Sequence, residues 1–288
     1  MTKIDTIESA VVLGAGTMGA GIAQVLAAAG IEARLVDVDA AALERATARV
    51  RANLDKGVEK GKVTAAQRDA TLAKLHTRTD LAQACQGANC IVEAVPERME
   101  LKTKLLALAA EHLPSTALVA SNTSSLSLTA IADAVPHPER VTGMHFFNPV
   151  HLMKLVEVVR ADQSSGEAVD ATTELARRLG KEPIVVKDRP GFASSRLGIA
   201  IGMEAIRMVE EEVASAEDID KAMTLGYGFP MGPLRLTDLV GLDVRLSIAE
   251  YLAETLGPRF QPPQLLRNMV AKGELGKKSG KGFYTYDD

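Results

Sequence analysis

The stretch of sequence that decides the fold is SAVVLGAGTMG, residues 9–19. Its first part, Ser9–Leu13, is an apolar run that predicts a buried strand, and glycines at positions 14, 16 and 19 follow that run directly. Apolar residues then recur at helical spacing through Gly19–Ala29. A strand, a glycine-rich turn and a helix in this order predict the first βα unit of a parallel sheet covered by helices.

The three glycines fit the pattern G-x-G-x-x-G, which in this setting predicts a dinucleotide site. Gly14 permits a tight turn, Gly16 lets the backbone approach a pyrophosphate, and Gly19 allows close packing of the helix on the strand. Thr17 and Met18 belong to the predicted site as well, because the dipole at a helix N-terminus attracts phosphates. A glycine turn without a ligand is the alternative.

An acidic residue at the end of the second predicted strand indicates which dinucleotide is bound. Asp37 closes the run Glu32–Asp37. A carboxylate there would accept hydrogen bonds from the adenosine ribose hydroxyls and would repel a 2′-phosphate. We therefore expect NAD rather than NADP as the cofactor. A chance coincidence of a glycine turn with a strand-end aspartate stays open as the alternative.

Short β-branched runs alternate with amphipathic stretches in the first part of the chain, which favours a doubly wound α/β domain of the Rossmann type. The predicted strands are Ser9–Leu13, Glu32–Asp37, Cys90–Ala94, Ala117–Ser121, Val141–His145, Lys154–Val159 and Pro183–Lys187. The connection Ala40–Leu75 is unusually long, and Lys60-Gly61-Lys62 interrupts it. We therefore expect two helices there that project from the sheet as a hairpin.

The pattern changes after Lys187. From Phe192 onward the apolar spacing is helical, and no strand signal interrupts it before Phe283-Tyr284. We therefore expect an α/β domain over residues 1–187, followed by a smaller all-α domain over residues 188–288. The predicted helices of the second domain are Ser194–Ala214, Ala216–Leu225, Leu239–Leu256 and Pro263–Lys272.

Composition excludes several classes of function. Of the 288 residues, 47% are hydrophobic and 24% charged, and a net charge of −4 supplies no basic field for nucleic acid. With no apolar run of membrane-spanning length and no secretory signal, we expect a cytoplasmic protein without a membrane segment. Cys85 and Cys90 have no partners at metal-ligand spacing, so we expect reduced thiols and no metal.

Four further segments carry recognisable motifs. They read IVEAVPE at 91–97, SNTSS at 121–125, MHFFNP at 144–149 and KDRPGF at 187–192. Together with the glycine turn, they make the chain resemble the 3-hydroxyacyl-CoA dehydrogenase family, particularly its short 3-hydroxybutyryl-CoA dehydrogenase branch. The resemblance covers essentially the whole chain, including GPLRLTDLVGLD at 232–243. It implies reversible, NAD-dependent oxidation of an (S)-3-hydroxyacyl-CoA, such as 3-hydroxybutyryl-CoA, to the 3-ketoacyl-CoA.

The resemblance assigns the catalytic base to His145, which ends a predicted strand. Removal of a hydride from C3 requires a base for the hydroxyl proton, and imidazole titrates near neutral pH. Glu157 lies inside the next predicted strand, and a hairpin folded near His151 would bring its carboxylate to the imidazole. That carboxylate would fix the tautomer and stabilise the imidazolium. A structural histidine and a surface glutamate are the alternatives.

Two polar loop residues are implied to line the reaction site. Ser124 follows a predicted strand, and the resemblance places its hydroxyl near the substrate oxygen and the nicotinamide. Asn148 resembles the residue with which relatives contact the nicotinamide. The alternatives are turn formation for Asn148 and helix capping for the serine, although capping is more natural for Ser125 or Ser127.

The resemblance also extends to the outer parts of both ligands. Glu97 and Lys102 match positions that line the cofactor's ribose region in relatives. Basic residues on the projecting hairpin contact the nucleotide phosphates of coenzyme A in relatives, so Lys56, Lys60 and Lys62 are the candidates here. Alternatively, Glu97 could be an acidic residue at the start of a helix, and the four lysines could be solvated surface residues.

One position departs from the family pattern. Relatives commonly carry Asn three residues after the Phe of the Pro-Gly-Phe motif, where its amide helps to hold the substrate. Ser195 takes that place here, and we include it among the catalytic residues. Serine is shorter and offers a hydroxyl instead of an amide, so its reach is reduced. The change bears on substrate choice or turnover rate and leaves the base and the cofactor site in place.

The resemblance implies a homodimer formed through the C-terminal helical domain. Two other functions stay open. An NAD-dependent dehydrogenase of a free hydroxy acid or sugar acid would share the histidine and the glutamate but would not need Lys56 or Lys60. A non-enzymatic NAD-binding protein, comparable to the lens crystallin relatives of this family, would be expected to have lost the catalytic residues.

Overall fold

An eight-stranded sheet organises the first part of the chain in the computed structural model, which describes residues 7–286. The strands lie in the order β3-β2-β1-β4-β5-β6-β7-β8, and all neighbours run parallel except β6 and β7. Their bounds are β1 (Ser9–Leu13), β2 (Glu32–Val36), β3 (Leu75–Arg78), β4 (Cys90–Glu93), β5 (Leu118–Ser121), β6 (Val141–Phe146), β7 (Leu155–Arg160) and β8 (Glu182–Lys187).

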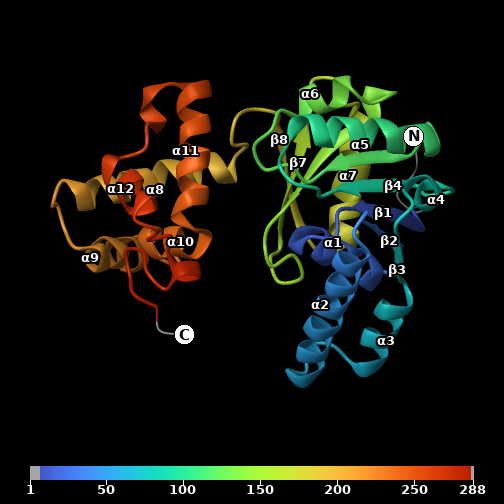
Figure 1. Cartoon of the computed structure of the whole chain (residues 1–288), viewed down its shortest axis with the longest axis horizontal. Helices are drawn as coiled ribbons and strands as arrows, with labels where there is room; N and C mark the ends of the chain where they lie inside the picture. The colour runs from blue at the N-terminus through green and yellow to red at the C-terminus, as the bar shows by residue number, and fades with distance from the viewer. Residues whose placement is uncertain (1–6, 287–288) are drawn as a thin grey trace. The chain divides into compact units, whose positions relative to one another are not determined.

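Helices cover both faces of this sheet (Figure 1). Ala10 and Val12 of β1 pack in one core with α1 (Thr17–Ala28), α2 (Ala40–Glu59) and α7 (Gly166–Arg178). Because side chains alternate along a strand, the intervening buried Val11 points to the opposite face. The buried residues of α4 (Leu81–Cys85), α5 (Met99–His112) and α6 (Leu128–Asp133) lie outside the first core, as expected for helices on the opposite face. The predicted doubly wound architecture is confirmed.

The long connection after β2 forms the predicted helical hairpin. Its second helix, α3 (Ala65–Ala73), begins at Thr64, whose side chain and that of Gln67 form a reciprocal capping box. Arg68 of α3 joins Asp55 of α2 through an ion pair of 3.2 Å. Figure 1 shows the two helices projecting away from the sheet as a pair.

The edge strand β3 was not predicted from the sequence. It pairs with β2 alone, and its only aliphatic residue is Leu75. Because an edge strand can be held by backbone hydrogen bonds to one neighbour, it needs no alternation of apolar residues. The seven predicted strands all form, with ends that shift by one residue at most.

The chain divides into two compact units between Arg189 and Pro190, two residues after the boundary expected from the sequence. The second unit contains the helices α8 (Ser194–Glu210), α9 (Ala216–Lys221), α10 (Pro233–Val240), α11 (Leu242–Leu256) and α12 (Gln264–Ala271). Its core contains Ile199, Met203, Leu234, Leu252 and Phe260. The predicted helical class of this part is confirmed. No helix within residues 7–286 is both long and apolar enough to cross a membrane.

Three local predictions for the second unit are wrong. The expected helix Leu239–Leu256 is broken at Gly241, whose φ of +104° ends α10 before α11 begins. The expected helix Ala216–Leu225 keeps α-helical geometry only to Lys221, and a π-helical turn follows. Residues 283–284 form no strand, because this segment is held by single bridges and by a buried carboxylate.

That carboxylate belongs to Asp238 on α10. Its Oδ1 accepts a hydrogen bond from the amide of Phe283 at 2.9 Å, and its Oδ2 accepts one from the amide of Tyr284 at 2.9 Å. The hydroxyl of Tyr286 donates to Oδ2 at 3.1 Å. A buried carboxylate thus fastens the C-terminal segment to the helical core.

We expect Asp238→Asn to lower the free energy of unfolding by about 2 kcal/mol, because an amide has one acceptor oxygen where the segment needs two. Urea unfolding measures this loss. Since the residue lies outside the first unit, the affinity for NADH should not change. An unaltered urea midpoint would contradict this account of the C-terminal segment.

Candidate active site

The glycine turn has the shape that a bound diphosphate requires. Gly14 has a φ of +103°, and a Cβ on it would lie 2.8 Å from the carbonyl oxygen of Ala94. A Cβ on Gly19 would lie 1.8 Å from the carbonyl oxygen of Gly14, so α1 could not pack there. In contrast, a Cβ on Gly16 would meet nothing within 4 Å, and no side chain caps α1. Its N-terminal amides therefore face an open approach.

Asp37 lies beside this turn, immediately after the end of β2. Its Oδ2 accepts a hydrogen bond from the amide of Ala15 at 2.8 Å, and its Oδ1 accepts one from the amide of Asp39 at 3.0 Å. Each carboxylate oxygen has a second lone pair, so both can also accept from a ribose hydroxyl. The turn and the carboxylate together fit a dinucleotide whose ribose carries free hydroxyls.

The imidazole of His145 and the carboxylate of Glu157 form a buried pair. The antiparallel register of β6 and β7 sets the two residues directly opposite each other. Met144, Val156 and Val158 point into the core beneath α1 and α7, so the alternation of strand side chains turns the pair to the other face. Nδ1 of His145 lies 2.7 Å from Oε2 of Glu157, with 7% of the histidine and 0% of the glutamate exposed.

This geometry defines the tautomer of the histidine. A carboxylate only accepts hydrogen bonds, so Nδ1 of His145 carries the proton and Nε2 is the basic nitrogen. The ring of Phe147 packs against the imidazole with the two centroids 4.6 Å apart. The arrangement can take up a proton at Nε2 and stabilise the resulting imidazolium through Glu157.

Glu97 holds the loop that contains Ser124. One carboxylate oxygen, Oε1, accepts hydrogen bonds from the hydroxyl of Thr123 at 2.7 Å and from the amides of Ser124 at 2.8 Å and Ser125 at 3.0 Å. The capping expected for Ser127 is present, since its hydroxyl accepts from the amide of Ala130 at the start of α6. Ser124 is therefore a loop residue in the structure and does not cap α6.

Lys102 is almost completely buried, with 1% of its surface exposed, and its ammonium has three acceptors. These are Oε1 of Glu93 at 2.7 Å, Oε2 of Glu97 at 3.1 Å and the carbonyl of Val95 at 3.2 Å. The other oxygen of Glu93 accepts from the hydroxyl of Ser121 at 2.6 Å. What the structure shows for Lys102 is an internal ion-pair network; direct contact with the ribose stays a prediction.

Sequence reasoning missed two members of this site. Glu93 is the only charged residue in the apolar run IVEAV, and a buried charge in a strand is a usable signal. Asn122 accepts a hydrogen bond from the amide of Phe146 at 2.8 Å through Oδ1, which ties the loop after β5 to the end of β6. Asparagine is so common in turns that its position alone gave no signal.

The remaining predicted residues lie on three other segments. Asn148 is exposed in the β6–β7 loop. Buried Lys181 holds this loop by donating hydrogen bonds to the carbonyls of Val150 and Met153, the latter at 2.9 Å. Ser195 is the second residue of α8, in the second unit. The predicted coenzyme A lysines, which are exposed at the tip of the α2–α3 hairpin, are Lys56, Lys60 and Lys62.

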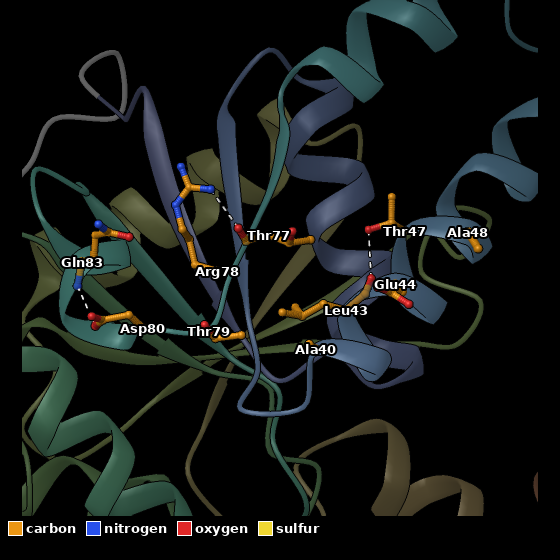
Figure 2. A pocket seen from close by; sticks show the side chains of 10 residues that line it. All are labelled: Ala40, Leu43, Glu44, Thr47, Ala48, Thr77, Arg78, Thr79, Asp80 and Gln83. Carbon is orange, nitrogen blue, oxygen red and sulfur yellow. Dashed lines mark hydrogen bonds between the residues drawn. The ribbon is translucent and has the colours of Figure 1, made fainter.

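A hollow of about 550 Å³ lies on the first unit, between α2 and the segment 77–83. Figure 2 shows its lining side chains, and none of the residues predicted for the site is among them. The lining consists of Ala40, Leu43, Glu44, Thr47, Ala48, Thr77, Arg78, Thr79, Asp80 and Gln83. The side chains described above therefore do not line this hollow.

Comparison with known families decides what the arrangement is. Residues 9–189 match the NAD-binding domain of 3-hydroxyacyl-CoA dehydrogenase, and residues 191–286 match the C-terminal domain of the same enzyme. The chain belongs to the 3-hydroxyacyl-CoA dehydrogenase family. As a member of that family it is an NAD-dependent oxidoreductase, and residues 9–189 form its NAD-binding domain.

Individual members of the family are similar over nearly the whole chain. It is 43% identical to 3-hydroxybutyryl-CoA dehydrogenase of Mycobacterium tuberculosis over 98% of this chain and 99% of that protein. It is 44% identical to 3-hydroxyadipyl-CoA dehydrogenase of Escherichia coli, of which it spans 59%, over 97% of its own length. The structure of (S)-3-hydroxybutyryl-CoA dehydrogenase from Ralstonia eutropha superimposes with a TM-score of 0.94 at 39% identity, covering 98% of this chain and 100% of that one.

The pKa of Glu97 provides a test of its ion pair with Lys102. Burial would by itself raise the pKa of Glu97, but the Lys102 ammonium and the hydrogen bonds from Thr123 and Ser124 outweigh it and lower the pKa to about 2. A lowered pKa stabilises the folded state fully above the ordinary value near 4.5, and that stability is lost as the pH falls toward 2.

We therefore expect Glu97→Gln to be less stable than the wild type at pH 7 and to lose less stability between about pH 4.5 and 2. Urea unfolding at a series of pH values measures both slopes. Glu100→Gln on the same segment is the control, because that carboxylate forms no ion pair within residues 7–286. Equal acid slopes for wild type and Glu97→Gln would refute the charge assignment.

Proposed function

We propose that this chain oxidises short-chain (S)-3-hydroxyacyl-CoA, with 3-hydroxybutyryl-CoA as the expected substrate, to the 3-ketoacyl-CoA, and that the reaction is reversible. The observation that carries the proposal is the 2.7 Å hydrogen bond between His145 and Glu157, buried in the NAD-binding unit. Names of similar proteins support the substrate class, since two relatives that this chain covers almost completely are named 3-hydroxybutyryl-CoA dehydrogenases.

In this proposal His145 is the general base. Its Nε2 accepts the proton of the substrate's 3-hydroxyl, while Glu157 keeps the proton on Nδ1 and stabilises the imidazolium. The bound NAD supplies the chemistry of a hydride acceptor. In the reverse direction the imidazolium returns its proton to the 3-keto oxygen. Ser124 is proposed to position that oxygen with its hydroxyl.

The cofactor residues act by holding and orienting. We propose that Gly14, Gly16, Thr17, Met18 and Gly19 present the helix amides to the diphosphate and that Asp37 holds the ribose. Asn148 is proposed to contact the nicotinamide amide. The network of Glu97 and Lys102 then serves the cofactor by fixing the loop on which Ser124 lies. Retention of the His145–Glu157 pair argues against a purely structural NAD-binding protein.

Replacing the base is the most direct test of the chemistry. We expect His145→Gln to lower kcat at least a thousandfold, since it removes the proton acceptor, and to leave the NADH dissociation constant nearly unchanged. Glu157→Gln should lower kcat about a hundredfold or more by removing the charge that stabilises the imidazolium. Kinetics with acetoacetyl-CoA and NADH measure both. His112→Gln is the matched control, and wild-type turnover by His145→Gln would disprove the role of the base.

The role of the coenzyme A group is tested by comparing a coenzyme A ester with the free acid. We expect (S)-3-hydroxybutyryl-CoA to be oxidised with a kcat/KM at least a hundredfold above that of free (S)-3-hydroxybutyrate, because the coenzyme A group adds binding energy. Changing both Lys56 and Lys60 to Gln should raise the KM for the CoA ester about tenfold and leave the KM for NAD unchanged. Equal use of the free acid would favour a hydroxy-acid dehydrogenase instead.

Ser195 supplies a separate part of the proposal. We propose that its hydroxyl contacts the substrate where relatives use an amide. Because the serine side chain is shorter than that of asparagine, it reaches less far toward the substrate. It lies at the start of α8, which follows the Pro-Gly-Phe motif. This single position is therefore proposed to tune turnover or substrate choice without altering the proton transfer at His145.

We also propose that the second unit forms a homodimer. Its surface exposes several large apolar side chains, and such side chains mark interaction sites when they form a contiguous patch. Leu225 is 84% exposed and Leu239 is 54% exposed. The others are Leu197, Ile201, Val213, Tyr227, Leu236, Val240 and Val244.

We expect Leu239→Glu to shift the protein from dimer to monomer, because a charge in an apolar interface would be buried without a partner. Light scattering after gel filtration measures the mass. Thr255→Glu is the control for an added charge on an exposed helical position of the same unit. A wild-type protein that runs as a monomer at micromolar concentration would remove the dimer from the proposal.

A further inference from the structure

One flank of α2 carries a row of polar and basic side chains that faces α1. The row consists of Arg49, Asn53, Lys56 and Lys60, whose spacings of four, three and four residues place them on one side of a helix. The row faces α1, because the side-chain amide of Asn53 donates a hydrogen bond to the side-chain oxygen of Gln24 on α1 at 3.2 Å.

Arg49 is the member nearest the glycine turn. Its Nη1 donates a hydrogen bond to the hydroxyl of Thr17 at 3.1 Å. Thr17 is the first residue of α1 and lies between the second and third glycines of the turn. An arginine from a different helix is thus held at the same end of α1 whose amides face the open approach over Gly16.

The charge of Arg49 is not neutralised by a carboxylate in the part of the chain that the structure describes. Within residues 7–286 its side chain forms no ion pair and is exposed to solvent. Arg45, one turn earlier on the same helix, is instead paired with Asp39 at 3.1 Å. A guanidinium has five donors, so the hydrogen bond to Thr17 leaves most of them available for an anion. Phosphate oxygens match that planar array of donors.

We propose that Arg49 is a further cofactor-binding residue, which donates to the diphosphate of the dinucleotide held by the glycine turn. The doubly negative diphosphate would then be met by the amides of α1 from one side and by a guanidinium of α2 from the other. The inference rests on the proposed function only through NAD binding, and it does not depend on the identity of the acyl substrate.

The other flank of α2 provides the matched comparison. Glu44 and Thr47 on that flank line the hollow of Figure 2. Arg51 is two residues beyond Arg49, which on a helix turns its side chain toward that side, and it is exposed as well. Arg51→Gln therefore removes the same charge from the same helix without touching the glycine turn.

The experiment measures NADH binding to the full chain by coenzyme fluorescence, with no acyl-CoA present. We expect Arg49→Gln to raise the NADH dissociation constant about tenfold and Arg51→Gln to change it less than twofold. Arg49→Lys should lie between, because it keeps the charge but loses the planar donors. The difference between Arg49→Gln and wild type should shrink as KCl is raised, since salt screens an exposed contact.

The same proteins are titrated with coenzyme A alone, which separates the two phosphate ligands. Arg49→Gln should leave that affinity unchanged. A variant that binds NADH within twofold of wild type, or that weakens coenzyme A instead of NADH, overturns the proposal. Urea unfolding confirms that each variant is folded. If wild type binds NADH but does not oxidise the acyl-CoA, the proposed substrate fails while the assignment of Arg49 stands or falls on these titrations.

Discussion

The hydrogen bond between His145 and Glu157 depends on one reversal of strand direction in an otherwise parallel sheet. Because β7 runs antiparallel to β6, the register sets the imidazole and the carboxylate opposite each other at a separation of 2.7 Å. The strand alternation then turns both side chains to one face, away from the core residues Met144 and Val158. A parallel neighbour reached by a long crossover would have needed a second, independent constraint to align the pair.

A second set of charged side chains holds the loop that contains Ser124. Glu93 and Lys102 would each be costly to bury alone, but they pair with each other, and Lys102 also pairs with the exposed Glu97. Because Glu97 accepts the amides of Ser124 and Ser125, the position of their loop follows from the ion pairs beneath it. The scaffold and the site are therefore connected through a few charged side chains and not through the apolar core alone.

The sequence was informative where local pattern and chemistry coincide. Strand alternation and the glycine turn predicted the sheet, and the spacing of His145 and Glu157 anticipated their contact. The edge strand β3 was not predicted, because backbone pairing to one neighbouring strand requires no pattern of apolar residues. Glu93 and Arg49 escaped for another reason: their partners Lys102 and Thr17 lie on other elements, so only tertiary packing brings them together. The break at Gly241 shows that one left-handed residue can end a helix whose apolar spacing continues.

The central claim is that Glu157 keeps a proton on Nδ1 of His145, so that Nε2 is the base. Nitrogen NMR of the protein with ¹⁵N-labelled histidine tests this directly above the pH at which the imidazolium titrates, with the signal assigned by its loss in His145→Gln. We predict a neutral ring that is protonated at Nδ1 and unprotonated at Nε2. A ring that carries its proton on Nε2 under these conditions would contradict the account.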